Sequence, residues 1–127
     1  MSLEDHRVDE VDIDGYKVYI GRDAVSNDYL SLRFARANDY WFHVKGMPSA
    51  HVILACHDQR PEKSTIKKIA GITAYYSKQK NAGKVAVIYT MAKYVSKSRG
   101  AKPGSVICKK ENTIMAKAIA PESIPQI

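Results

Sequence analysis

One segment of the sequence carries a clear helical repeat, and it separates two groups of strand-like runs. Apolar and small residues recur there at intervals of three and four, which predicts a helix over about residues 61–81. Pro61 suits the first turn of such a helix, and Asn81-Ala82-Gly83 is a typical termination sequence. The predicted apolar face consists of Ile66, Ile69, Ala70, Thr73, Ala74 and Ser77.

The runs on either side of this helix are rich in β-branched and aromatic residues, as strands are. A less regular stretch near residues 23–33 predicts a shorter helix or a turn. One long helix among several short strands is typical of an α+β domain, with a mixed or antiparallel sheet packed against the helix. The predicted strands lie at 16–21, 41–45, 51–55, 84–91, 105–110 and 113–120.

The length of 127 residues favours a single domain, because a chain of this size can bury about two-thirds of its unfolded surface. We expect this domain to occupy residues 15–120. Residues 1–14 are acidic, which predicts a poorly ordered lead-in, and residues 121–127 predict a C-terminal tail.

Charge is distributed very unevenly along the chain, although the net charge is only +7. Residues 1–62 carry 7 Lys/Arg against 11 Asp/Glu, a net charge of −4. Residues 63–127 carry 13 Lys/Arg against 2 Asp/Glu, a net charge of +11. So basic a half indicates a polyanionic partner such as a nucleic acid.

The sequence lacks the features of exported and membrane proteins. No apolar run approaches the roughly 20 residues that span a bilayer, and the acidic N-terminus does not resemble a signal peptide. Cys56 and Cys108 are too few for a disulfide framework and form no CxxC pair. We therefore expect a cytoplasmic protein without a membrane partner, while the oligomeric state stays open.

Residues 39–54, DYWFHVKGMPSAHVIL, concentrate side chains that could carry chemistry. The nearby set His43, His51, Cys56 and His57 matches no compact zinc spacing, so we predict no metal and no cofactor. The alternative is that these histidines, with Trp41, line or order a binding surface.

A catalytic set would combine Asp39 with His43 or His51 and a serine such as Ser49. No GxSxG elbow surrounds that serine, and the chain has no phosphate-binding glycine loop. We therefore predict no catalytic residue. An RNA-processing or tRNA-modifying enzyme that uses the Asp39, His43 and His51 region is the alternative hypothesis.

The segment KSRGAKPG, residues 97–104, favours contact with phosphates. Lys97, Arg99 and Lys102 supply positive charge, while Gly100, Pro103 and Gly104 shape the loop and let its backbone approach a phosphate. Tyr94 could stack on an unpaired base or line the surface. The lysines expected to extend the basic patch are Lys93, Lys109 and Lys110.

Four segments in order, IGRDAVSNDYLSLRFARANDYWFHVKGMPSAHVIL, AYYSKQK, VAVIYT and VSKSRGAKPGSV, resemble the NFACT-R domain. This domain is the C-terminal module of NFACT proteins, the ribosome quality-control factors often labelled fibronectin-binding proteins. The resemblance spans about residues 16–110. Two positions depart from the usual motifs: Ser49-Ala50 stands where relatives read Gly-Ser, and Ser96 replaces a cation.

The resemblance implies an RNA-binding domain and not a catalytic one. Its expected partners are tRNA or rRNA, with the large ribosomal subunit as the site of action. A protein–protein adaptor or an adhesin-type module, as the fibronectin label suggests, is a further alternative.

Overall fold

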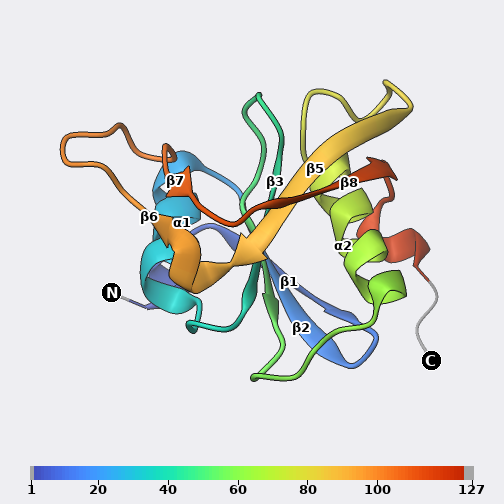
Figure 1. Ribbon diagram of the computed structural model, residues 1–127, viewed down its shortest axis with the longest axis horizontal. Helices are drawn as coiled ribbons and strands as arrows, with labels where there is room; N and C mark the ends of the chain where they lie inside the picture. The colour runs from blue at the N-terminus through green and yellow to red at the C-terminus, as the bar shows by residue number, and fades with distance from the viewer. Residues whose placement is uncertain (1, 125–127) are drawn as a thin grey trace.

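A computed structural model describes residues 2–124 and shows a sheet with helices on both of its faces (Figure 1). The strand order is β1-β2-β4-β3-β5-β8, and every neighbouring pair is antiparallel. The predicted α+β class with an antiparallel sheet is thereby confirmed. The strands are β1 (Val8–Ile13), β2 (Tyr16–Gly21), β3 (Tyr40–Val44), β4 (Val52–Ala55), β5 (Lys84–Met91) and β8 (Asn112–Lys117).

Helix α2 (Lys63–Tyr75) covers one face of the sheet and buries the apolar side chains that its periodicity marks. Ile66, Ile69 and Ile72 join Phe42 and Leu54 in the larger of two hydrophobic clusters. Gly71 lets the helix approach the chain beyond β8, where the Ile119 N–H donates to the Gly71 carbonyl at 3.0 Å. The sheet and this helix are thus held together mainly by burial of branched aliphatic side chains.

Helix α2 ends at Tyr75, earlier than the predicted boundary near residue 81. The Ala50 N–H donates to the Tyr76 carbonyl at 3.2 Å, and Ser49 forms an isolated β-bridge with Ser77. These contacts use a carbonyl that a longer helix would need, so the chain leaves the helix to pair with the β3–β4 connection. The tertiary contact therefore overrides the helical pattern of residues 76–81.

The opposite face of the sheet carries α1 (Ala24–Tyr29), which continues into the π-helical turn η2 (Leu30–Phe34). This agrees with the predicted short helix near residues 23–33. A small two-stranded sheet, β6 (Val95–Ser96) with β7 (Ile107–Cys108), lies on this side as well. The second hydrophobic cluster is centred on Leu30, Trp41, Ile53, Ile88 and Val95. Short 3-10 helices are η1 (Leu3–Asp5), η3 (Ala92–Tyr94) and η4 (Pro121–Ser123).

The first strand corrects the expectation that residues 1–14 are poorly ordered. Residues 8–13 form β1, which pairs with β2 along its whole length. Lys17 bonds to Glu10 and Asp12 of β1 at 3.2 and 2.8 Å, so the acidic side chains lie at the solvent side of a paired strand. In the predicted tail, Ile124 is buried, while residues 125–127 lie outside the described part of the chain.

Within residues 2–124, the structure contains no helix that is both long enough and apolar enough to cross a membrane.

The β1–β2 turn provides a test of the pairing of β1. Asp14 and Gly15 both have positive φ, 53° and 86°, and a Cβ at Gly15 would meet no atom within 4 Å. We predict that Gly15→Ala costs about 1 kcal/mol of unfolding free energy, because alanine resists the left-handed conformation. Gly15→Asn should cost clearly less, since asparagine tolerates that conformation. Urea unfolding measures the free energy of both variants. Equal losses in Gly15→Ala and Gly15→Asn would contradict a left-handed conformation at this position.

Candidate nucleic-acid interface

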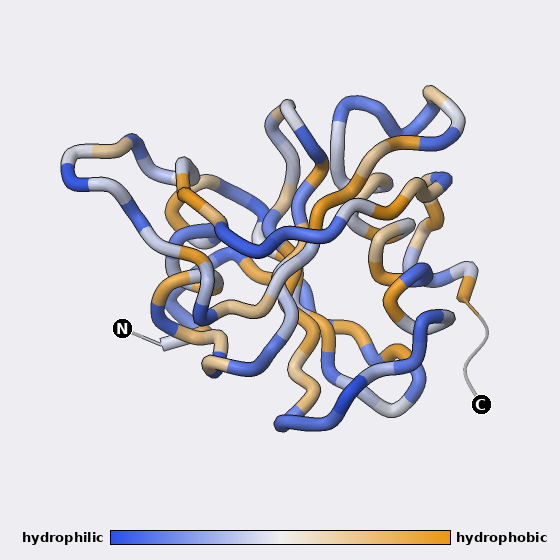
Figure 2. Tube along the Cα trace, in the orientation of Figure 1, coloured by the Kyte–Doolittle hydropathy of each residue, from blue (hydrophilic) through white to orange (hydrophobic). Residues whose placement is uncertain are grey.

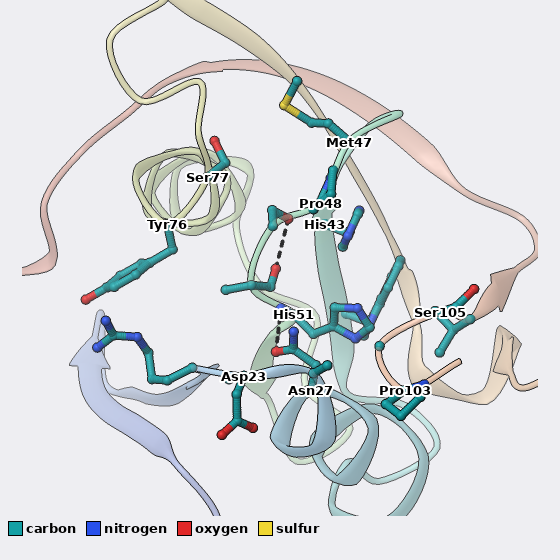
Figure 3. A pocket seen from close by; sticks show the side chains of 18 of the residues that line it. Asp23, Asn27, His43, Met47, Pro48, His51, Tyr76, Ser77, Pro103 and Ser105 are labelled. Atoms are coloured by element: carbon teal, nitrogen blue, oxygen red, sulfur yellow. Dashed lines mark hydrogen bonds between the residues drawn. The ribbon is translucent and has the colours of Figure 1, made fainter. Parts of the chain in front are cut away.

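A groove of about 950 Å³ opens on the α1 side of the sheet (Figure 3). Its floor comes from strands and includes Trp41, His43, His51 and Ile88. Its walls come from four separate connections, and they are residues 21–24, 46–50, 76–78 and 102–106. The groove therefore joins the histidine region and part of the basic loop, which the sequence placed about 50 residues apart.

A chain of hydrogen bonds fixes the floor of the groove. The Trp41 indole Nε1–H donates to Ser31 Oγ at 2.9 Å, and Ser31 Oγ lies 2.7 Å from His51 Nδ1. An indole N–H can only donate, so the serine oxygen accepts from Trp41 while it stays within hydrogen-bond distance of His51 Nδ1. The chain Trp41–Ser31–His51 thereby fixes the orientation of the His51 ring.

Both groove histidines are neutral at physiological pH. Burial lowers the pKa of His51 to about 4, and burial also lowers the pKa of His43. The His43 ring stacks on Trp41 with centroids 5.7 Å apart and meets His51 edge-on at 5.1 Å. Trp41 is only 2% exposed, so it supports the floor from below and offers little surface for stacking.

The Asp39 carboxylate forms hydrogen bonds with backbone N–H groups and not with the histidines. Its carboxylate accepts the Arg36 N–H at 2.9 Å and the Cys56 N–H at 3.2 Å. It is 3% exposed and does not line the groove. The candidate catalytic set of Asp39, His43 and His51 is therefore not brought together.

The other candidate ligands of a metal also have separate partners. The Cys56 thiol donates to the Asn38 carbonyl at 3.3 Å, and His57 Nδ1 lies 3.4 Å from the Arg36 guanidinium. Within the part of the chain that the structure describes, no three His, Cys, Asp or Glu side chains form a group that could hold a metal ion.

The basic loop is tethered to α1 by the carboxylate of Asp28. Asp28 Oδ1 accepts the Gly104 N–H at 3.0 Å, and Asp28 Oδ2 lies 2.9 Å from Lys97 Nζ. Lys97 Nζ also donates to the carbonyls of Lys102 at 2.6 Å and Ser105 at 3.0 Å. An ammonium group has three hydrogens, and these three oxygens use them all. In this structure Lys97 closes the loop, although the sequence suggested a phosphate contact.

The two loop glycines have left-handed backbone conformations. Gly100 and Gly104 have φ of 77° and 84°, a region that other residues rarely adopt. A Cβ at Gly104 would also lie 3.2 Å from the Ala24 Cβ, so glycine allows the loop to contact α1. Arg99 and Lys102 remain exposed on this projecting, largely hydrophilic loop (Figure 2), and Pro103 lines the groove.

A second basic cluster lies at the base of the loop, outside the groove. The Nζ atoms of Lys93 and Lys110 lie 5.4 and 5.1 Å from the centre of the Tyr94 ring. The Lys109 N–H donates to the Tyr94 carbonyl at 3.0 Å, which extends the β6–β7 pairing. This pairing connects the cluster to the loop, as the sequence analysis expected, but none of these four residues lines the groove.

Several groove residues had no predicted role. The Asn27 Oδ1 accepts the His51 backbone N–H at 3.0 Å, and a Cβ at Gly21 would overlap this oxygen. Arg22 places its guanidinium 5.0 Å from the centre of the Tyr76 ring and also bonds to Asp9 at 2.6 Å. Gly21, Asn27 and Tyr76 belong to the segments that carry the family resemblance. The sequence did not show that these three residues line the same groove. Ser31 lies in the first of these segments, although no motif in the sequence marks it.

We predict that Lys97→Met loosens the loop without unfolding the domain. The Lys97 ammonium holds the Asp28 carboxylate that accepts the Gly104 N–H, so its loss should let that hydrogen bond open more often. Amide hydrogen exchange at Gly104 should accelerate about tenfold, as expected for loss of one charge-assisted hydrogen bond. Arg99→Met, at an exposed position of the same loop, is the control and should leave that exchange rate unchanged.

The buried neutral His51 makes stability depend on pH. The pKa of His51 is near 6.5 in the unfolded chain and about 4 in the folded chain. Stability should therefore fall as pH decreases through this window, by about 1.4 kcal/mol per unit from His51. The lowered pKa of His43 acts in the same direction. Urea unfolding between pH 7 and 5 tests this. The loss should persist in His57→Gln and diminish in His43→Phe.

Comparisons with known proteins agree with these observations. The family described as "NFACT protein RNA binding domain" matches residues 8–110. The protein named "Rqc2 homolog RqcH" from Bacillus subtilis (strain 168) is 37% identical over 100 residues, which are 79% of this chain and 17% of that protein. Its namesake from Streptococcus suis (strain 05ZYH33) is 30% identical over 97 residues, 76% of this chain and 17% of that protein.

A solved structure shows the same fold. It is the C-terminal part of the fibronectin/fibrinogen-binding protein from Streptococcus suis, with a TM-score of 0.82 and 27% identity. The match covers 90% of this chain and 45% of that one. The chain thus spans about a sixth of the length of the curated relatives that it matches. On the extent of the sequence match and the shared fold, the chain belongs to the NFACT RNA-binding domain family.

Proposed function

We propose that this chain binds RNA through the basic loop and the groove beside it. The observation that carries this proposal is the tether: Asp28 and Lys97 fix the loop, while Arg99 and Lys102 of the same loop stay exposed. A loop that is already ordered loses little conformational freedom on binding, so more of the contact energy becomes affinity. Its exposed guanidinium and ammonium groups suit phosphate oxygens.

The cluster around Tyr94 extends this surface. Lys93 and Lys110 flank the Tyr94 ring, and β6–β7 joins the cluster to both ends of the loop. Cations at both places would follow successive phosphates of one strand, as in grooves that track a nucleic-acid backbone. The net charge of +11 in residues 63–127 favours the approach of such a polyanion.

The RNA is proposed to be tRNA or rRNA, met in the cytoplasm on the large ribosomal subunit during ribosome quality control. The family description supports RNA as the ligand, and the relatives support ribosome quality control as the setting. We further propose a binding role without catalysis, which the separate positions of Asp39 and the two groove histidines support.

We predict that the double variant Arg99→Ala/Lys102→Ala weakens binding to a tRNA and flattens the dependence of affinity on salt. Each lost phosphate contact should reduce the log–log salt slope by about 0.7–0.9. Lys93→Ala/Lys110→Ala should have an effect of the same kind. Binding measured by fluorescence anisotropy at several salt concentrations gives both quantities.

The matched control is Lys63→Ala/Lys67→Ala, which removes the same charge from exposed positions of α2 on the other face. A folded Arg99→Ala/Lys102→Ala variant with unchanged affinity and slope would remove the loop from the RNA interface. Ribosomal proteins recovered equally well after nuclease treatment would instead indicate a protein partner.

A further inference from the structure

The amide nitrogen of Asn27 points a hydrogen-bond donor into the groove. Asn27 is 9% exposed, and its Oδ1 accepts the His51 N–H. No hydrogen bond from Nδ2 to any atom of residues 2–124 is present, and every fully buried side-chain nitrogen or oxygen there has a partner. The Nδ2 atom therefore reaches the groove surface, and Figure 3 shows Asn27 at the groove. An oriented donor at the groove surface, with no partner in the described chain, is available to a ligand.

His43 supplies a second neutral polar group to the same groove. Its ring is held flat against Trp41 and lines the floor, and burial lowers its pKa. A neutral imidazole has one donor nitrogen, one acceptor nitrogen and no charge. Asn27 and His43 are thus better suited to the edge of a nucleobase than to a phosphate, which favours cations.

Apolar and aromatic side chains form the walls between these polar groups. Met47 and Pro48 stand on one side, Pro103 on another, and Tyr76 on a third (Figure 3). Val106 also lines the groove. Flat apolar walls with a small number of fixed polar groups are what a planar heterocycle requires. The volume of about 950 Å³ accommodates a nucleotide with part of its backbone.

Charged groups lie around these walls. Arg22, Lys78 and Lys102 contribute positive charge to the lining, and Asp23 contributes the negative charge. Hydrogen bonds to Ser26 lower the pKa of Asp23, whose carboxylate accepts the Ser26 N–H at 2.8 Å as the cap of α1. The excess of cations would neutralise the phosphates on either side of an inserted base.

We propose that the groove binds one unpaired nucleotide of an RNA strand, with the base edge on the Asn27 amide and the His43 ring. The flanking phosphates then lie toward Lys102 and Lys78. This inference rests on the proposed RNA-binding function and adds that the chain selects single-stranded over paired RNA. In a duplex, the base edges are paired and stacked, so they cannot enter the groove.

Two variants change the groove chemistry while keeping its framework. Asn27→Asp retains an oxygen for the His51 N–H and removes the amide donor. His43→Phe retains the stack on Trp41 and removes the ring nitrogens. Each should weaken binding to a single-stranded RNA of about ten nucleotides by roughly three- to tenfold, the effect of one net hydrogen bond. Binding to a duplex of the same sequence should change little with His43→Phe.

Matched controls separate these effects from charge and from ring chemistry. Gln59→Glu adds the same negative charge as Asn27→Asp at an exposed position outside the groove. Tyr16→Phe removes a polar group from an aromatic ring that also lies outside it. Trp41 is the only tryptophan and lies on the groove floor, so its fluorescence reports occupation of the groove directly.

The decisive probe is the same single strand with its bases removed at successive positions. Loss of affinity and of the Trp41 fluorescence change on removal of bases supports the proposal. Equal binding of intact, abasic and duplex RNA, with full sensitivity to Arg99→Ala/Lys102→Ala, would overturn the nucleotide site and leave the loop as the RNA interface. Absence of binding to every RNA would overturn the proposed function itself.

Discussion

The carboxylate of Asp28 bonds to two points of a loop that lies far along the chain, at Lys97 and at Gly104, the latter 76 residues away. The neighbouring side chain of Asn27 accepts the N–H of His51, the residue directly before β4. Two consecutive residues of α1 therefore join the sheet and the loop. The floor and one wall of the groove therefore share a single set of contacts through α1.

This arrangement explains why a cluster of histidine, tryptophan and aspartate lacks the features of an active site. Ser31 fixes the ring orientation of His51, and burial keeps both groove histidines neutral. Asp39 faces the backbone of Arg36 and Cys56. Trp41, Ser31 and His51 bond to one another and Asp39 bonds to the backbone, which gives a rigid floor without a paired acid and base.

Periodicity was sufficient to predict the α+β class, the central helix and most strands, because burial on one face imposes a regular spacing. It failed for β1, although the sequence VDEVDIDG alternates and ends in Asp-Gly, a strong hairpin signal. The acidic residues led to a prediction of disorder for this segment. An edge strand such as β1 needs apolar residues on one face only, so its other face can be acidic. It also failed at residues 76–81, where pairing with Ser49 and Ala50 ends the helix.

The sequence indicated separate segments of the candidate site, but it did not show that they lie together. The sequence indicated the basic loop and the histidines, yet no local pattern shows that Lys102, Pro103 and Gly104 lie beside His43 and His51. Lys97 illustrates the limit most clearly. In the sequence, Lys97 is one more basic residue of the loop, like Arg99 and Lys102. In the folded chain, its ammonium group bonds to Asp28 and to two carbonyl oxygens.

Two classes of cation therefore coexist in one short loop, and they respond differently to their surroundings. Lys97 is largely shielded from solvent, so mobile ions screen its bond to Asp28 only weakly. Arg99 and Lys102 face the solvent and are fully subject to ionic strength. The shape of the loop and its attraction for anions can thus vary independently. A substitution such as Ser96 for a cation can tune the attraction while the architecture remains the same.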